Sequence, residues 1–269
     1  QLRPTASRDE QFCRAFAGSV GLPIVVESID VQGYAGSQRL SVEDAARRLR
    51  YDFLHRAAGR LGADRIAVGH TRDDQAETFL LKLIRGAGLT GLGGIYPRRG
   101  VIVRPLIDVA RADLRSYLQA RGQTWVEDET NDDLGNPRNR IRRLVLPELD
   151  RAYGSATTPA IARAPALIRD DGAYLDEMSE RRYADVAVLV PDGVEIDAAA
   201  LAADPPPVQR RVLQKALRAM SGNREVGLDH VEGALKVLSG ACGPMDAPGS
   251  RVELRRGKLV LIRQKGSAQ

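Results

Sequence analysis

The chain has 269 residues and a formal net charge of +5, with 40 lysine and arginine residues against 35 aspartate and glutamate residues. This length predicts two domains, and the sequence contains neither an apolar run long enough to cross a membrane nor a basic and apolar leader, which argues for a cytoplasmic protein. Cys13 and Cys242 form neither a CxxC pair nor part of a zinc motif, so two free thiols are expected. The basic excess favours a polyanionic partner but by itself leaves nucleic-acid binding open.

The sequence begins with a helix pattern. Ser7 and Glu10 form a capping box at its start. After a Gly-Leu-Pro break, residues 24–31 have the β-branched content of a strand. Ser41 then predicts the start of a second helix, with Asp44 at the reciprocal capping position.

Alternation of strands and helices continues further along the chain. A short apolar strand is expected at residues 65–69 and a helix at residues 72–85, followed by a glycine-rich connector and a hairpin-like stretch that ends at residues 101–103. Asp108 is expected to cap the next helix. This order predicts an α/β domain over residues 1–150 with a doubly wound, mainly parallel sheet.

Residues 151–269 predict a smaller, mostly helical second domain. Helical patterns cover residues 151–182, 208–220 and 228–239. The last pattern predicts a hairpin over residues 252–262, with two apolar strands around an Arg-Gly-Lys turn.

Three acids cluster where the strand at residues 65–69 leads into the following helix. Asp73, Asp74 and Glu77 fall on adjoining faces of the first two helical turns, and the intervening base is Arg72. A purely structural reading is available, because Thr71 can cap the helix with Asp74, and acids favour a helix N-terminus. Repelling carboxylates are usually retained where a cation neutralises them, which favours a site for Mg²⁺ or for the ammonium group of a substrate.

Two neighbouring features are candidates for phosphate binding. His70 ends the strand, where its imidazole could reach a phosphate or a reacting group, although a histidine satisfied at a strand end is an equal alternative. The glycine-rich connector starts with Arg85, and its residues Gly86 and Gly88 would allow backbone N–H groups to approach phosphate. A glycine-rich run is also typical of tight turns, so this signal is weaker.

A dense basic run follows the acidic segment at residues 128–133. It contains Arg138, Arg140, Arg142 and Arg143, four arginines within six residues. A solvated helix face is the commonest explanation for such a run, but its single sign makes contact with an RNA backbone a serious alternative.

These segments resemble, in order and spacing, the tRNA(Ile)-lysidine synthases of the PP-loop superfamily. The resemblance covers most of residues 1–150, and the remainder is similar to the second domain of that family. The matching sequence segments are Ala46–Tyr51, Gly69–Thr78, Arg85–Leu92, Arg104–Leu106, Trp125–Asp128 with Asn131, and Arg138–Arg142.

The resemblance implies an ATP- and Mg²⁺-dependent ligase that joins free lysine to C2 of the wobble cytidine of tRNA(Ile) with a CAU anticodon, through an adenylated intermediate. It further implies that Asp74 and Glu77 hold the lysine ammonium or the metal, with Asp73 beside them, and that His70 faces the adenylate. Arg47 or Arg50 would meet the lysine carboxylate or the phosphates, with Arg50 preferred. Four further arginines would position tRNA together with the second domain, namely Arg85, Arg138, Arg140 and Arg142.

One family motif has no counterpart in this sequence. The Ser-Gly-Gly-x-Asp-Ser loop of the superfamily does not occur in these residues, and residues 2–10 resemble the family segment that follows the second strand. We therefore expect the loop to lie before residue 1 and this chain alone to show weak or no activity. A PP-loop tRNA thiolase and a non-catalytic tRNA-binding pseudoenzyme are the alternatives, and a homodimer is an open expectation.

Overall fold

The structure is a computed structural model that describes residues 6–127 and 132–264. The chain divides into two compact units, Gln1–Ala166 and Leu167–Gln269, which are described one at a time. The expected domain boundary near residue 150 stays a prediction, and the division between the two compact units falls later in the chain, after residue 166. The reason is that Ile161 and Ala162 pack against the buried side chains of Ala76, Ile141 and Leu146, so the first turns of a later helix belong to the first unit.

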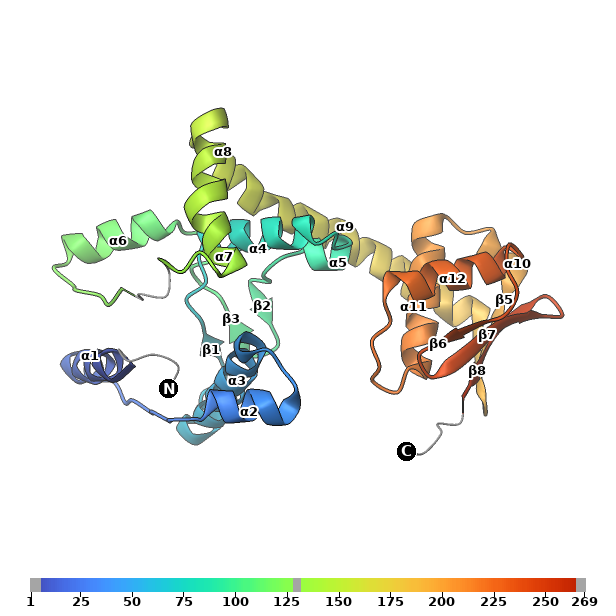
Figure 1. Ribbon diagram of the computed structural model, residues 1–269, viewed down its shortest axis with the longest axis horizontal. Coiled ribbons are helices and arrows are strands. Elements are labelled where there is room, and N and C mark those ends of the chain that lie inside the picture. Colours follow the sequence, from blue (N-terminus) through green and yellow to red (C-terminus); the bar gives the residue numbers. More distant parts are fainter. Residues whose placement is uncertain (1–5, 128–131, 265–269) are drawn as a thin grey trace. The chain divides into compact units, whose positions relative to one another are not determined.

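The first unit is mainly helical around a small sheet. Three short strands, β1 (Ile66–Ala67), β2 (Arg98–Arg99) and β3 (Ile102–Val103), form a sheet in the order β1-β3-β2. β1 and β3 are parallel, whereas β2 and β3 form the expected antiparallel hairpin. The helices, shown in Figure 1, are α1 (Ala6–Ser19), α2 (Val31–Gln38), α3 (Val42–Leu61), α4 (Arg72–Ile84), α5 (Leu89–Leu92), α6 (Arg111–Ala120), α7 (Pro137–Arg140) and α8 (Leu146–Tyr153), with a π-helical turn, Ile141–Val145, between α7 and α8.

Local capping rules predict two helix starts correctly. Ser41 caps α3, and its hydroxyl donates to the Asp44 carboxylate at 2.8 Å. Thr71 caps α4 in a complete capping box with Asp74. Because these signals need only residues three positions apart, they do not depend on the rest of the fold.

Three local predictions are wrong. Ser7 does not cap the first helix, because α1 already begins at Ala6 and Ser7 lies within it. Residues 24–30 form no strand, and Asp30 instead caps α2, which the sequence did not predict. A β-branched segment becomes a strand only when a neighbouring strand bonds to it, and the described three-stranded sheet provides none at this place. Asp108 does not cap α6, whose N-cap is Ala110, without a side-chain bond.

Gly94 closes the glycine-rich connector against α4. The buried Gln75 side chain donates to the Ile95 carbonyl at 3.0 Å and accepts from the Ile95 N–H at 2.7 Å. Gly94 has φ +63°, and a Cβ there would lie 2.6 Å from Oε1 of Gln75. Only glycine satisfies both the backbone conformation and the close approach.

We therefore expect Gly94→Ala to lower the free energy of unfolding by about 2 kcal/mol, because overpacking adds to left-handed backbone strain. Gly86→Ala is the matched control, since Gly86 has φ +68° but open space around its Cβ position, and it should cost about 1 kcal/mol. Urea unfolding of the two variants measures the difference. Equal losses would show that the contact with Gln75 adds nothing.

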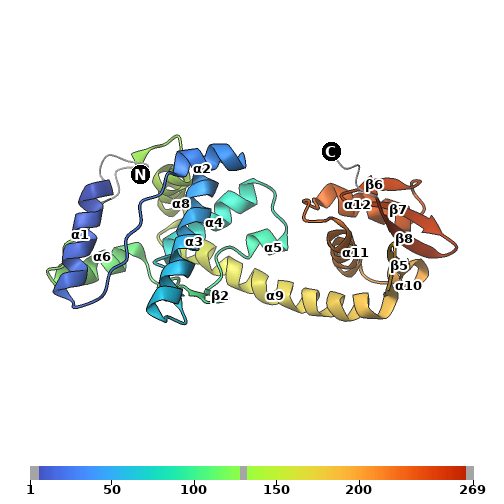
Figure 2. The same ribbon diagram turned by 90° about the horizontal axis from the view of Figure 1, so that it is seen from below.

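The second unit consists of a sheet packed against helices. Its five antiparallel strands lie in the order β4-β5-β8-β7-β6, and α11 and α12 contact β8 and β7 (Figure 2). The predicted helices and terminal hairpin are confirmed, while the sheet is larger than the hairpin alone. The elements are α9 (Thr157–Val186), which begins in the first unit, β4 (Ala187–Val190), β5 (Gly193–Asp197), α10 (Ala198–Ala202), α11 (Pro206–Met220), α12 (Leu228–Leu238), β6 (Met245–Ala247), β7 (Ser250–Arg255) and β8 (Lys258–Arg263).

The core of this unit lies between the sheet and those helices. Its fully buried members include Ile196, Leu213, Leu217, Leu259 and Leu261. Among the helices that the structure describes, none combines the length and the hydropathy that a bilayer crossing requires.

Candidate active site

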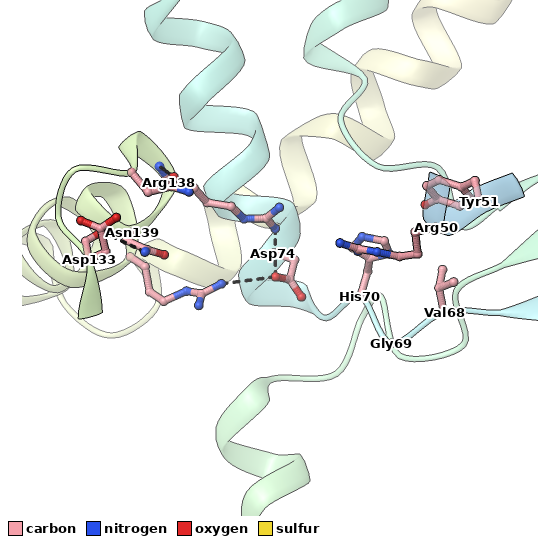
Figure 3. A pocket seen from close by; sticks show the side chains of 11 residues that line it. Arg50, Tyr51, Val68, Gly69, His70, Asp74, Asp133, Arg138 and Asn139 are labelled. Carbon is pink, nitrogen blue, oxygen red and sulfur yellow. Dashed lines mark hydrogen bonds and ion pairs between the residues drawn. The ribbon is translucent and has the colours of Figure 1, made fainter. Parts of the chain in front are cut away.

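A polar cavity of about 570 Å³ opens where β1 leads into α4. Val68 continues the pairing with β3, since its N–H donates to the Val103 carbonyl at 3.0 Å, and the chain then turns into α4. Ligands in open α/β sheets bind at this carboxyl end of the strands. The cavity is lined by Arg50, Tyr51, Val68, Gly69, His70, Asp74, Asp133, Asn136, Arg138, Asn139 and Arg142 (Figure 3).

Asp74 is held by the start of α4 and by arginines. Its Oδ2 accepts from the Thr71 N–H and the Thr71 hydroxyl, both at 2.8 Å. Its Oδ1 accepts from Arg138 at 2.9 Å and from Arg111 at 3.2 Å, and Figure 3 shows Arg138 reaching this carboxylate. Burial acts to raise the pKa of Asp74, but the Thr71 bonds and the charges of Arg138 and Arg111 hold that pKa below its ordinary value.

Glu77 is fully buried one turn further along α4, with 0% of its side chain exposed. Arg142 binds the Glu77 carboxylate with two nitrogens, because its Nε donates to Oε1 at 2.6 Å and its Nη2 donates to Oε2 at 3.0 Å. Nε of Arg138 also donates to Oε2, at 2.7 Å. A third arginine, Arg111, lies 3.5 Å from Oε1. The sequence interpretation counted Arg72 as the base near these acids, whereas the structure supplies three arginines from distant segments.

The segment after residue 136 divides the basic run between two faces. Asn136 caps α7, and the helix continues through the π-helical turn into α8. Arg138 and Arg142, four positions apart, share the face toward α4, while Arg140 and Arg143 are exposed and Arg143 pairs with Asp132. One helical segment therefore supplies both the counter-charges of Asp74 and Glu77 and exposed guanidinium groups on its outer side.

Asp73 has a backbone partner. Its Oδ2 accepts from the Arg111 N–H at 2.8 Å, at the start of α6. Arg111 was not predicted from the sequence, and neither was the buried Arg104, which contacts His70. The matched segment Arg104–Leu106 could have marked Arg104 as a candidate site residue, but the contact of Arg104 with His70 depends on how the chain folds.

The remaining predicted site residues lie in different places. Arg50 lines the cavity, whereas Arg47 stacks on Tyr51, with its guanidinium carbon 5.6 Å from the ring centroid. Arg85 is the C-cap residue that follows α4, and neither Arg85 nor Gly86 or Gly88 lines the cavity. Their roles remain predictions, and the expectations for residues 1–5 and 128–131, including Asp128 and Asn131, fall outside the described residues.

The acids of the cavity do not form an all-protein metal site. Within residues 6–127 and 132–264, no group of three His, Cys, Asp or Glu side chains is placed to hold a metal ion, whereas Mg²⁺ that accompanies a nucleotide usually needs only one or two carboxylates beside the phosphates. The oxygens of Asp74 and Glu77 already accept bonds from Thr71 and from arginines. The metal role of Asp74 therefore stays a prediction.

Comparison with known families defines the class of protein. A family model described as a PP-loop domain matches residues 1–149, and the chain belongs to this family. The polar cavity at the carboxyl end of β1 lies where open α/β folds bind their ligands.

The curated relatives specify the class further. A tRNA(Ile)-lysidine synthase from Thermus thermophilus is 36% identical over 261 residues, which cover 97% of this chain and 50% of the relative. Those of Geobacter sulfurreducens and Symbiobacterium thermophilum are 38% and 36% identical, covering 86% and 97% of this chain and 50% and 57% of the relatives. The chain thus spans about half the length of the curated relatives it matches.

Proposed function

We propose that the chain is part of a tRNA(Ile)-lysidine synthase and carries residues of its active site. The observation that supports this most directly is that His70, Asp74 and Arg50, from two matched family segments, line one cavity in a PP-loop domain. The relatives that match most of the chain carry this name. The substrates are ATP, free lysine and tRNA(Ile) with a CAU anticodon, and Mg²⁺ accompanies the nucleotide.

The reaction has two steps. The C2 oxygen of the wobble cytidine attacks the α-phosphorus of ATP, so that an O–P bond forms and pyrophosphate leaves. The ε-amino nitrogen of lysine, after losing its proton, then attacks C2, so that a C–N bond forms, the C–O bond breaks and AMP leaves. The lysine-modified base pairs with A instead of G, which changes the tRNA from methionine to isoleucine identity.

The charges of the cavity suit both steps. The ionised carboxylate of Asp74 attracts a lysine ammonium, and Arg50 offers a guanidinium to phosphate or to the lysine carboxylate. Arg138 and Arg142 retain exposed fractions of 30% and 21%, so they can meet an anion while they hold Glu77. Glu77 itself is enclosed, and we assign it to fixing those two arginines instead of binding lysine directly.

Arg140 is the member of the basic run best placed to contact the tRNA backbone. It is exposed, and among the described residues no carboxylate pairs with it. Replacing Arg140 by Gln should weaken tRNA binding and reduce the slope of log affinity against log salt by about 0.7, the contribution of one single-strand phosphate contact. Arg151→Gln is the control, because Arg151 is exposed but already paired with Glu148. An unchanged slope for Arg140→Gln would contradict the assignment.

The function itself is tested with the full-length gene product that contains this chain. The protein is incubated with ATP, labelled lysine and an isoleucine tRNA transcript. Label entering the RNA supports the synthase, sulfur incorporation from a sulfur donor would support a thiolase, and binding without either product would support a pseudoenzyme.

A further inference from the structure

A buried arginine contacts one of the two imidazole nitrogens of His70. Nε of Arg104 donates to Nδ1 of His70 at 3.3 Å, and Arg104 is 8% exposed. Two other bonds fix Arg104. Its side-chain Nη1 donates to the Tyr96 carbonyl at 2.6 Å, and its backbone N–H donates to the Pro97 carbonyl at 2.8 Å. The guanidinium is thus held in place independently of His70.

The contact determines where the imidazole proton can be. A guanidinium has only donors and does not lose its proton in proteins, so Nδ1 of His70 must be the acceptor. A neutral imidazole then carries its proton on Nε2. Turning the ring over would put a C–H edge against the guanidinium and leave a buried N–H of Arg104 without a partner, which costs free energy.

The surrounding charges act in the same direction. Burial is the largest cause that lowers the pKa of His70 below its ordinary value, and Arg104, Arg138 and Arg47 lower it further, against the opposing effect of Asp74. The Asp74 carboxylate is itself shared with arginines. The uncharged ring is therefore the favoured state at neutral pH.

We propose that Arg104 is a positioning residue that keeps His70 as a neutral Nε2–H donor, and that His70 acts on a phosphate or developing oxyanion of the substrate as a hydrogen-bond donor and not as a general base. A general base needs a free lone pair on the ring, but Nδ1 is occupied by Arg104 and Nε2 carries the proton. The identity of the acceptor rests on the proposed function, whereas the protonation state of His70 does not.

The first test is spectroscopic and needs no substrate. The chain has three histidines, so ¹⁵N-histidine labelling gives three imidazoles to follow with pH. His230 is a matched internal control, because its Nδ1 accepts from the Gly227 N–H at 3.1 Å, and the exposed His55 is a reference in water. We expect the His70 signals to show an unprotonated Nδ1 and a protonated Nε2 throughout the neutral range.

Arg104→Met should shift the titration midpoint of His70 upward and move its Nδ1 signal toward the tautomer average. Arg99→Met, which removes an exposed arginine from the neighbouring strand β2, should change neither. A proton on Nδ1, or an imidazolium at neutral pH, in the unmodified protein would overturn the proposal, and that result is available even if Arg104→Met does not fold. An unchanged His70 spectrum in a folded Arg104→Met protein would also overturn it.

The second test separates a donor from a base by activity. Gln supplies an N–H but cannot act as a base, so His70→Gln should retain at least about tenfold more turnover than His70→Ala, which should lose about 10²-fold. Equal losses in the two variants would overturn the donor role. If the unmodified full-length protein forms no lysidine, the proposed function fails, while the spectroscopic result on Arg104 and His70 stands by itself.

Discussion

Replacing Glu77 by Gln should lower the free energy of unfolding by about 3 kcal/mol. The carboxylate has no exposed surface and neutralises Arg138 and Arg142, so its removal leaves two partly buried guanidinium groups with too little negative charge. Breaking a buried ion pair by removing one partner costs about 3–5 kcal/mol, and the lower end applies because both arginines keep some contact with water. Urea unfolding followed by circular dichroism measures the change.

Glu148→Gln is the matched control for this prediction. Glu148 also pairs with an arginine, Arg151, but its side chain is 58% exposed, so its loss should change stability by no more than about 0.5 kcal/mol. In the double variant Glu77→Gln/Arg142→Gln, the total loss should be smaller than the sum of the single losses, because one unpaired charge is removed together with its partner. Additive effects, or a Glu77→Gln protein as stable as the control, would show that Glu77 does not hold this group together.

The sequence predicts the elements around the site better than the contacts within it. The Ser41 and Thr71 caps depend on residues three positions away, and both are confirmed. The segment at residues 24–30 shows the limit of this reasoning, since β-branched content predicts a strand but only a partner strand makes one. Asp30 and the short helix after it were missed because the strand pattern was preferred at that place.

The pairing of acids and arginines required the tertiary structure. The acids at positions 74 and 77 were found from their spacing, and the basic run from its density, but these are more than sixty positions apart in the chain. One available signal was overlooked. Helical periodicity puts Arg138 and Arg142 on one face and Arg140 on another, so the run could have been divided into an inner and an outer group before the structure was known. Arg111 gave no such signal, because it stands outside the basic run and is brought to Asp73 and Asp74 only by the fold.

Replacing Asp74 by Ala should cost at least about 3 kcal/mol of transition-state stabilisation, a turnover reduced more than about 10²-fold, with tRNA affinity nearly intact. The folded-state pKa of Asp74 is lowered, so the stability that its ionisation contributes is present above the unfolded pKa of about 3.9 and is lost as the pH falls through the folded value. Asp74 is therefore ionised at assay pH, and the variant removes a full negative charge from the cavity. Single-turnover lysidine formation and tRNA binding are measured on the same full-length protein.

Asp44, at the start of α3, provides the control for Asp74. Asp44 occupies the same third position of α3, with its carboxylate bound to the Ser41 hydroxyl, but it does not line the cavity with His70. Asp44→Ala should therefore lose a similar capping interaction, about 1 kcal/mol of stability, without the loss of turnover. If Asp74→Ala and Asp44→Ala reduce turnover alike, or if Asp74→Ala weakens tRNA binding as much as turnover, then Asp74 serves only to start its helix. A loss of turnover in Asp74→Ala that Asp44→Ala does not share would therefore assign the chemistry to the negative charge at the end of β1 and not to the stability of α4.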